Sequence, residues 1–306
     1  MNSVVCQEMK KWVVFTEALR ELYIAIGVLS LGISLIATVG NALIVLAIIR
    51  SPSLHKPSYV LLCALALSDF CVGFIVQPLF IAVRIAEMKG EPSIYCPLGL
   101  AYFSSCGFLL WMSCLTLVMV SVDRFLAVYL GASYRIAVTL KRVLLTILLV
   151  AFASGFFAAI YVINMTAYFI LINAVIPFCL LSMGICYFKI GRLLKRHQKR
   201  MISHKKRAEI VAVQNNEVHL GFNAVRCQRS ISTVLYVYFA YLVCYLPYLG
   251  FSIAENILVQ RTVYVHAAYL ITAVIVLSNS MFNPLCYYWR LAEIRAAVNQ
   301  MLHRNS

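Results

Sequence analysis

The amino-acid sequence predicts an all-α membrane protein, a seven-transmembrane helix bundle with a short amphipathic eighth helix. Its composition differs from that of a soluble domain, because 63% of the 306 residues are hydrophobic and only 12% are charged, against about 45–50% and about 25% in soluble domains. Seven apolar stretches run along the chain, and nearly every one reaches the roughly 20 residues that a helix needs to cross the hydrocarbon core. We therefore expect most of the chain to lie in a bilayer.

The apolar stretches divide the chain in a simple order. They lie near residues 22–49, 58–84, 95–122, 143–163, 167–194, 230–254 and 263–288. We expect an outer amino-terminal segment at 1–21, one seven-span domain at 22–288, and an amphipathic helix with a short tail at 289–306. The fourth and fifth stretches are separated only around Asn164, and their combined length favours two spans over one long helix. The only long connection, loop three at about 195–225, is basic and polar.

The segment after the last stretch has the periodicity of a helix that lies on a membrane. Apolar residues recur there at helical spacing, and they are Leu291, Ile294, Val298, Met301 and Leu302. Charged and polar residues occupy the other side of this helix, and they are Arg290, Glu293, Arg295 and Asn299. This pattern predicts an amphipathic helix in the interface plane.

The distribution of basic residues predicts the orientation of the chain. With the amino terminus outside, the outer segments hold only six of the 26 Lys and Arg residues, namely Lys10, Lys11, Arg20, Arg84, Lys89 and Arg261. The positive-inside rule then places the amino terminus outside the cell and the carboxyl terminus in the cytoplasm. The net charge of +15 is concentrated on the inner face, where it attracts anionic lipid. We expect a multi-pass plasma-membrane protein with membrane lipid, and not nucleic acid, as the partner of this charge.

Polar and helix-breaking residues interrupt six of the seven stretches. They are Asn41, Asp69, Asp123, Arg124, Pro177, Pro247, Asn283, Pro284 and Tyr287. Such groups are costly in a bilayer, so each marks a candidate functional site. Their arrangement resembles that of the rhodopsin-like (class A) G-protein-coupled receptors, and the resemblance covers most of the chain. It implies a receptor that converts the binding of an extracellular ligand into activation of a heterotrimeric G protein.

The resemblance also implies which residues act as the coupling and activation switch. They are Asp123, Arg124, Phe125, Tyr134, Tyr245, Pro247, Asn283, Pro284 and Tyr287. Asp123 is expected to hold Arg124 while the inner side is closed, and Pro247 to provide a hinge in the sixth span. The chain departs from the family at Phe125, where Tyr is usual, and at Tyr245, where Trp is usual. Cys227 stands where the family has an acidic partner for Arg124, which leads to the hypothesis of raised basal signalling.

Asp69 is an isolated carboxyl group in the middle of the second stretch. The family pattern surrounds it with further oxygen-bearing side chains, and in this chain they are Asn41, Ser113, Asn279, Ser280 and Asn283. The resemblance therefore implies an allosteric sodium ion bound by Asp69, Ser113, Asn279, Ser280 and Asn283, with no other cofactor. The alternative is a protonated carboxyl group that only contributes to packing.

The ligand pocket is assigned by resemblance alone. Its expected residues are Gln77, Cys106, Leu110, Phe169, Asn173, Tyr245, Tyr248, Ser252, Tyr269 and Ala273. These side chains are mostly apolar or aromatic, which slightly favours a lipid or a small neutral molecule as the ligand. A peptide that contacts Arg84, Glu87 and Glu255 at the rim remains an alternative.

The outer side departs from the family in its cysteines. The family usually ties the third span to a cysteine in the second outer loop, but that loop is reduced here to residues around Asn164 and contains none. Only Cys6 and Cys96 are expected on the oxidising side, where disulfides form. A Cys6–Cys96 disulfide is therefore our hypothesis, and two free thiols are the alternative.

Other functional classes find less support in the sequence. The six histidines show no metal-ligand spacing with carboxylates, and no Cys-x-x-Cys pair or glycine-rich phosphate loop is present, so we do not expect an enzyme. A secondary transporter or channel is the alternative. It would predict internal symmetry between two halves, whereas this chain has an odd number of spans and no visible repeat.

Overall fold

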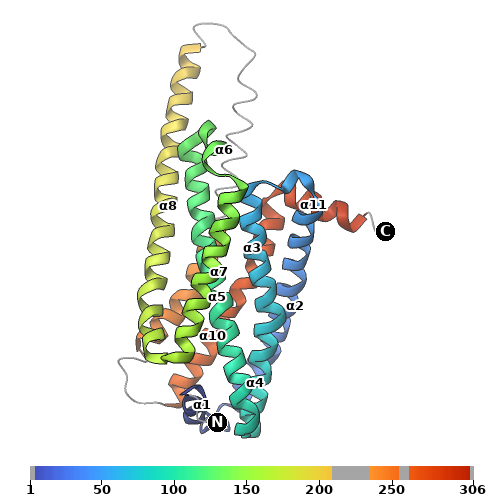
Figure 1. Cartoon of the computed structure of the whole chain (residues 1–306), viewed down its shortest axis with the longest axis vertical. Helices are drawn as coiled ribbons and strands as arrows, with labels where there is room; N and C mark the ends of the chain where they lie inside the picture. The colour runs from blue at the N-terminus through green and yellow to red at the C-terminus, as the bar shows by residue number, and fades with distance from the viewer. Residues whose placement is uncertain (1–3, 209–234, 255–261, 304–306) are drawn as a thin grey trace.

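The computed structural model describes residues 4–208, 235–254 and 262–303, and these residues form a bundle of helices (Figure 1). The spans in chain order are α2 (Arg20–Arg50), α3 (Pro57–Cys71) continued by η2 (Val72–Val76) and α4 (Gln77–Lys89), α5 (Pro92–Leu130), α7 (Leu140–Ile163), α8 (Met165–Ala208), the helix Leu235–Ala254 and α10 (Val263–Arg290). Shorter helices are α1 (Val4–Val13), η1 (Pro52–Leu54), η3 (Gly131–Ser133), α6 (Tyr134–Ala137) and α11 (Ala292–His303). Within the described residues, seven helices are long and apolar enough to cross a membrane, as the sequence predicts.

The two kinds of side chain are distributed as a bilayer requires. Large apolar residues point outward from the bundle, for example Phe152 at 79% and Phe178 at 71% exposure. Polar residues of the spans are buried between the helices, among them Asn41 and Asp69 at 0% exposure. A soluble protein would not leave so many large apolar side chains uncovered, so the outer surface of the bundle suits hydrocarbon.

Local sequence signals set the ends of several spans. Pro57 and Pro92 stand at the first positions of α3 and α5, where the missing proline N–H costs no hydrogen bond. The hydroxyl groups of Thr139 and Thr262 cap α7 and α10 by accepting backbone N–H bonds of 3.4 and 3.3 Å. Gly90 ends α4 in a left-handed conformation with φ of 69°, which glycine adopts without strain.

The second span changes from α-helix to π-helix at Val72–Val76 before it continues as α4. Pro78 explains this change, because proline lacks the backbone N–H and its ring collides with the preceding turn of an α-helix. A π-helical turn accommodates such an interruption. The sequence analysis did not use Pro78, although the residue is the signal for this feature.

The outer half of the second span is longer than the sequence predicts. The structure extends this span to Lys89, beyond the predicted end at residue 84. Arg84 and Glu87 therefore lie inside a helix, each at 2% exposure, and the prediction that they stand at the rim is wrong. The apolar stretch ended at Arg84 in the sequence because a buried ion pair has the same composition as an exposed one.

The fourth and fifth spans are separated by a single residue. Asn164 follows the last residue of α7 and precedes the first residue of α8. Its side-chain oxygen accepts a hydrogen bond from the backbone N–H of Ala167 at 3.0 Å. Asn164 therefore ends one helix and caps the next, which is how two spans fit where the sequence offers almost no loop.

The last helix, α11, packs on the bundle. Ile294 and Val298 are buried at 0% and 3% exposure, and α11 contacts α2. The Tyr59 hydroxyl group of α3 donates a hydrogen bond to Glu293. The face that the sequence assigned to the membrane is thus partly covered by protein, while Leu302 at its end is 53% exposed.

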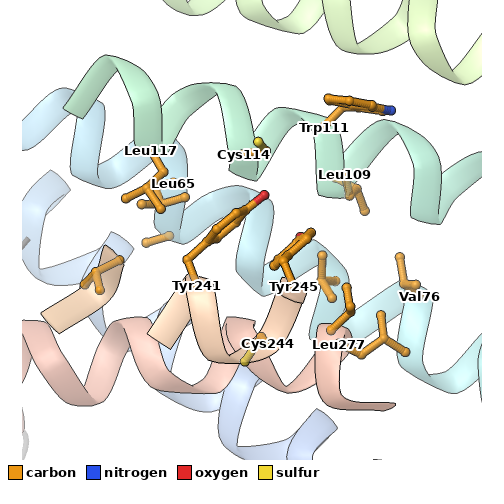
Figure 2. Packing of buried hydrophobic residues seen from close by; sticks show 14 of the residues in the cluster. Leu65, Val76, Leu109, Trp111, Cys114, Leu117, Tyr241, Cys244, Tyr245 and Leu277 are labelled. Carbon is orange, nitrogen blue, oxygen red and sulfur yellow. The ribbon is translucent and has the colours of Figure 1, made fainter. Parts of the chain in front are cut away.

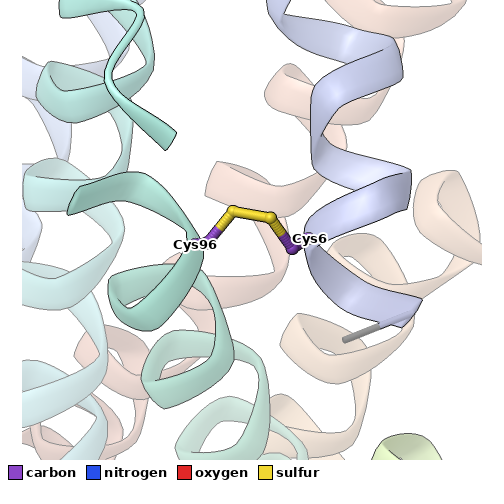
Figure 3. Close-up of a disulfide and its surroundings, with 2 residues drawn as sticks. All are labelled: Cys6 and Cys96. Carbon is purple, nitrogen blue, oxygen red and sulfur yellow. A yellow bond between two sulfur atoms is a disulfide. The ribbon is translucent and has the colours of Figure 1, made fainter. Parts of the chain in front are cut away.

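The two ends of the bundle are distinct (Figure 1). At one end, here called the amino end, α1 lies beside the last turns of α4. A disulfide joins Cys6 of α1 to Cys96 of α5, with a Cα–Cα distance of 5.0 Å (Figure 3). At the opposite end, here called the carboxyl end, lie α6 and α11. α8 extends well past the predicted end of its span, to Ala208.

Candidate functional site

A charged cluster at the carboxyl end surrounds Asp123 of α5. The Arg124 Nη2 atom lies 2.6 Å from Asp123 Oδ2, and the Ser58 hydroxyl group of α3 donates to the same oxygen at 2.9 Å. The Tyr134 hydroxyl group of α6 donates to Asp123 Oδ1. Charge-assisted hydrogen bonds of this kind are the strong ones in proteins. Arg124 is therefore held by a carboxylate that two other helices keep in place.

The neighbours of this cluster connect it to the fifth span. The Ser121 hydroxyl group of α5 lies 3.0 Å from the Tyr187 hydroxyl group of α8. The Lys189 ammonium group lies 5.8 Å from the centre of the Phe125 ring, which is within the range of a cation–π interaction. Phe125 thus contacts α8 through its ring face, for which a hydroxyl group is not needed. Cys227, named in the sequence analysis, lies outside the described residues.

A second polar cluster lies around Asp69 in the middle of the bundle. Asn283 of α10 donates a hydrogen bond from Nδ2 to Asp69 Oδ2, and the Ser113 hydroxyl group of α5 donates to Oδ1 at 3.2 Å. The Ser280 side chain also interacts with the carboxyl group. Asn41 of α2 donates from Nδ2 to the Ser280 carbonyl oxygen at 2.9 Å. Four spans therefore meet at this carboxyl group.

The donor set of this cluster fits a small hard cation. Asn41, Asn279 and Asn283 are 0–3% exposed, and within the described part of the chain their Oδ1 atoms have no hydrogen-bond partner. An unpaired buried carbonyl oxygen costs free energy, and a sodium ion bound by oxygen ligands would remove that cost. The six oxygen-bearing residues named from the sequence are thus gathered in one place, with acceptor atoms to spare.

The aromatic pair Tyr241 and Tyr245 lies above this cluster on the helix Leu235–Ala254. Their rings stack with centroids 3.9 Å apart and an interplanar angle of 13°. Figure 2 shows Tyr241 directed toward Cys114 of α5 and Tyr245 beside it. Pro247 follows in the same helix, where it has no backbone N–H to continue the helical hydrogen bonds. The sixth span therefore has an aromatic contact to α5 next to its weakest point.

In the last span, Asn283, Pro284 and Tyr287 all face the interior of the bundle. Tyr287 is 1% exposed, and Pro284 packs against Gly40 of α2, where an added Cβ would stand 2.9 Å from the proline Cγ. Gly40 is needed for this close approach of two helices, because any side chain would collide with the ring. The switch residues of α10 are therefore packed, and not exposed to lipid.

A cavity of about 140 Å³ lies between the spans on the amino side of the aromatic pair. Seven of the predicted pocket residues line it, together with Ala273: Cys106, Leu110, Phe169, Tyr245, Tyr248, Ser252 and Tyr269. Its wall is mostly aromatic and apolar, as is usual for small-molecule sites. Tyr245 belongs both to the cavity and to the stacked pair, so the cavity and the sixth-span hinge share a side chain.

Two predicted pocket residues are not part of the cavity wall. Gln77 is fully buried, and its Nε2 atom donates to the Leu277 carbonyl oxygen of α10 at 3.3 Å. Asn173 lies on α8 between Ile172 and Ile176, which both line the cavity. The amide of Gln77 is thus a contact between helices, and the prediction that it faces the cavity does not match the structure.

A polar group at the amino end of the cavity was missed from the sequence. Arg84 and Glu87 of α4 form an ion pair of 2.9 Å, the Tyr23 hydroxyl group of α2 donates to Glu87 at 3.2 Å, and His266 Nε2 of α10 lies 2.7 Å from the same hydroxyl group. Three of these side chains, Arg84, Glu87 and His266, line the cavity. The positions are far apart in sequence, so no motif signals them.

The amino-terminal helix α1 closes this end of the cavity. Met9 and Trp12 belong to the cavity wall, and the Trp12 ring stacks on His266 with centroids 5.0 Å apart. The Cys6–Cys96 disulfide holds α1 against α5 (Figure 3). Because residue 164 is the whole connection between α7 and α8, the covering element here is α1 and not a loop between those spans.

Comparison with known proteins agrees with this geometry. The chain matches the family described as 7 transmembrane receptor (rhodopsin family) over residues 40–168 and 159–287. It is 22% identical to human melanocortin receptor 3 over 289 residues, covering 92% of this chain and 84% of that receptor. It is 26% identical to human prokineticin receptor 2 over 304 residues, covering 86% and 73%.

A solved structure shows the same fold. The crystal structure of squid rhodopsin superimposes with a TM-score of 0.79 and 20% sequence identity, covering 92% of this chain and 85% of that one. The family match spans most of the chain, and the seven spans occur in the order that the family requires. These findings do not favour the alternative of a secondary transporter or channel. The chain belongs to the rhodopsin family of seven-transmembrane receptors, the class A G-protein-coupled receptors.

Proposed function

We propose that this receptor binds a small extracellular ligand in the cavity at its amino end and activates a heterotrimeric G protein at its carboxyl end. Membership of the family implies both an extracellular ligand and a G protein. The observation that carries the proposal is that α5 contributes to both sites, with Cys106, Leu110 and Cys114 in the cavity wall and Asp123 and Arg124 in the charged cluster. A rise of 1.5 Å per residue separates Cys114 from Arg124 by about 15 Å.

We propose that the amino end faces the cell exterior in the plasma membrane. Most Lys and Arg residues then lie on the cytoplasmic side, as the positive-inside rule requires. The disulfide between Cys6 and Cys96 supports this orientation, because disulfides persist on the oxidising side of the membrane. The basic carboxyl end would then lie against anionic lipid.

Signal transfer in this proposal begins at Tyr245. A ligand that contacts the Tyr245 ring changes its stacking on Tyr241, and the helix below Pro247 swings as a rigid unit. A ligand can shift this equilibrium only by binding the open conformation more tightly than the closed one. Opening at the carboxyl end breaks the contact between Asp123 and Arg124, and Arg124 then contacts the G protein.

We propose that a sodium ion binds at Asp69 in the closed conformation. Its ligands would be drawn from Asp69, Ser113, Asn279, Ser280 and Asn283, and the unpartnered amide oxygens support this assignment. The ion would supply positive charge at a buried carboxylate and would hold the surrounding spans together. The hypothesis of raised basal signalling rests on Cys227 and stays a prediction.

Expression in cells tests the function as a whole. An epitope tag at the amino terminus is expected to be accessible to antibody on intact cells, and a carboxyl-terminal tag only after permeabilisation. Dissociation of each Gα class from Gβγ is then followed by energy transfer, with and without a library of small neutral molecules and lipids. Activation of at least one Gα class above the receptor-free level supports the proposal, whereas surface expression without activation of any class contradicts it.

A further inference from the structure

The polar group at the amino end of the cavity has balanced charge. Arg84 and Glu87 form the ion pair, and both side chains are 2% exposed. The aromatic rings of Phe80 and Tyr23 lie 5.3 and 5.9 Å from the guanidinium carbon. Among the described residues of this group, no second acid or base faces the pair. An additional charge brought here by a ligand would be buried without a counter-charge, which is costly.

The directions of the hydrogen bonds follow from the number of protons. The Tyr23 hydroxyl group has one proton, and it donates that proton to Glu87 Oε2 at 3.2 Å. The contact of 2.7 Å between Tyr23 and His266 Nε2 therefore needs the proton of the histidine ring. In the neutral imidazole, the proton on Nε2 leaves Nδ1 as an acceptor.

Two atoms of this group are left without a partner. The Arg84 Nε–H donor and the His266 Nδ1 acceptor are buried, and they have no hydrogen-bond partner among the described residues. Both side chains line the cavity. A buried polar atom without a partner is costly, so a ligand that satisfies both atoms binds more tightly than one that satisfies neither.

The cavity itself limits the rest of the ligand. Its volume of about 140 Å³ is close to that of an engineered cavity that binds benzene. Aromatic side chains form much of its wall, among them Tyr102, Phe103 and Tyr269. These dimensions favour a single ring or a short apolar chain as the body of the ligand, and α1 leaves no open groove for a longer one.

We infer that the cavity selects small, uncharged ligands whose polar end both accepts a hydrogen bond from Arg84 Nε–H and donates one to His266 Nδ1, as an amide or a hydroxyl group does. This inference rests on the proposed function for its biological meaning, since it names the ligand class of the same site. A carboxylate offers no proton to His266, and an ammonium group offers no acceptor to Arg84. Trp12 stacks on the face of the His266 ring and fixes the direction of its edge.

Four probes of similar size test the inference on the full-length receptor in lipid nanodiscs. They are benzamide, benzoate, benzylammonium and toluene, which present an amide, an anion, a cation and no polar group on the same ring. Binding is measured at millimolar concentrations as the shift of the thermal unfolding midpoint. We expect benzamide to stabilise the receptor, with an affinity roughly tenfold higher than that of toluene. Benzoate and benzylammonium are expected to give smaller shifts than benzamide.

Each other ranking overturns the inference. A larger shift with benzoate would make Arg84 an anion site, and a larger shift with benzylammonium would make Glu87 a cation site. Equal shifts with benzamide and toluene would mean that the polar group does not contact the ligand. If no probe produces a shift, the cavity does not take ligands of this size.

Three variants identify the atoms involved. His266→Phe keeps a ring beside Trp12 and removes the acceptor, and Arg84→Lys keeps the charge beside Glu87 and removes Nε–H. Each is expected to lower benzamide affinity by roughly tenfold and to leave toluene affinity unchanged. Tyr102→Phe removes a hydroxyl group from the same cavity outside the polar group and is expected to bind benzamide as wild type does. An equal loss in all three variants, or in none, contradicts the inference.

The test separates this inference from the proposed function. Thermal shifts are measured without G protein, so a receptor that activates no Gα class can still show the predicted ranking of probes. A receptor that activates a G protein but ranks the probes differently retains its function and loses the inferred ligand class.

Discussion

Asn283 donates a hydrogen bond from Nδ2 to Asp69 Oδ2, and this bond joins α10 to the second span inside the bundle. Ser113 of α5 donates to the other carboxylate oxygen at 3.2 Å. The carboxyl group is fully buried, so a movement of any of the three spans changes its surroundings. A cation bound here would stabilise the arrangement in which Arg124 is paired with Asp123.

The first prediction concerns sodium. Replacing choline chloride by sodium chloride at constant ionic strength is expected to slow basal nucleotide exchange on Gα, because an ion that binds one conformation stabilises it. The expected slowing is roughly fivefold or more. Asp69→Asn removes the charge and keeps the shape, and its exchange rate is expected to be the same in both salts. The same salt response in wild type and Asp69→Asn would contradict a sodium site at this carboxyl group.

The second prediction concerns the hold of Asp123 on Arg124. Asp123→Asn keeps the size of the side chain and removes its negative charge, so the contact of 2.6 Å to Arg124 is weakened. We expect basal nucleotide exchange to rise by up to roughly tenfold, since a hydrogen bond to a charged group contributes about 1.5–3 kcal/mol. Glu293→Gln is the control, because Glu293 belongs to a different carboxyl-end contact, with Tyr59. An unchanged or lower rate in Asp123→Asn would show that Asp123 does not restrain Arg124.

The third prediction concerns the disulfide between α1 and α5. Replacing Cys6 and Cys96 by serine opens a cross-link over 90 positions of sequence, and disulfides that close long loops typically contribute about 2–4 kcal/mol. We expect a thermal unfolding midpoint lower by several degrees. We also expect faster maleimide modification of Cys106, which lines the cavity beneath α1.

Two comparisons make this third test specific. The background of the other free cysteines is subtracted with the same protein carrying Cys106→Ser. If the rate at Cys106 is unchanged when the disulfide is removed, α1 does not control access to the cavity.

The fourth prediction concerns the approach of α2 to the π-helical turn. A Cβ added to Gly73 would stand 2.8 Å from Thr38 Oγ1 and 2.9 Å from the Thr38 backbone nitrogen, and the backbone cannot yield as a flexible side chain does. Gly73→Ala is expected to lower the unfolding midpoint, because overpacking costs about 1–3 kcal/mol. Gly27→Ala is the matched control, since nothing lies within 4 Å of its added Cβ. Equal midpoints for the two variants would contradict the close contact.

The seven spans and the motif residues could be predicted from the sequence, for physical reasons. Hydrophobic length marks a span without knowledge of its neighbours, and a polar residue such as Asp69 or Asn283 stands out against an apolar background. These two residues lie 214 positions apart and are hydrogen-bonded in the structure. The family resemblance supplied the expectation that they meet.

The polar group above the cavity could not be predicted in the same way. Glu87 and His266 are linked only through Tyr23, at separations of 64 and 243 positions. Arg84 and Glu87 shorten the apolar stretch, so they look like the start of a loop. Histidines were searched only for metal-ligand spacing, which His266 does not have. The covering role of α1 was missed because a ten-residue helix is too short to stand out by periodicity.

The central claim is that Arg124 acts at the contact with a G protein, and one measurement tests it most directly. The rate of GTPγS binding to the responsive Gα class is compared for purified wild type, Arg124→Ala and Arg142→Ala, each with its surface expression and unfolding midpoint recorded. Arg142 is an exposed arginine at the same end that donates to the Ala137 carbonyl oxygen at 2.6 Å. We predict that Arg124→Ala falls to the receptor-free rate while Arg142→Ala retains the wild-type rate. An Arg124→Ala receptor that is folded and exchanges nucleotide as fast as wild type would contradict the account.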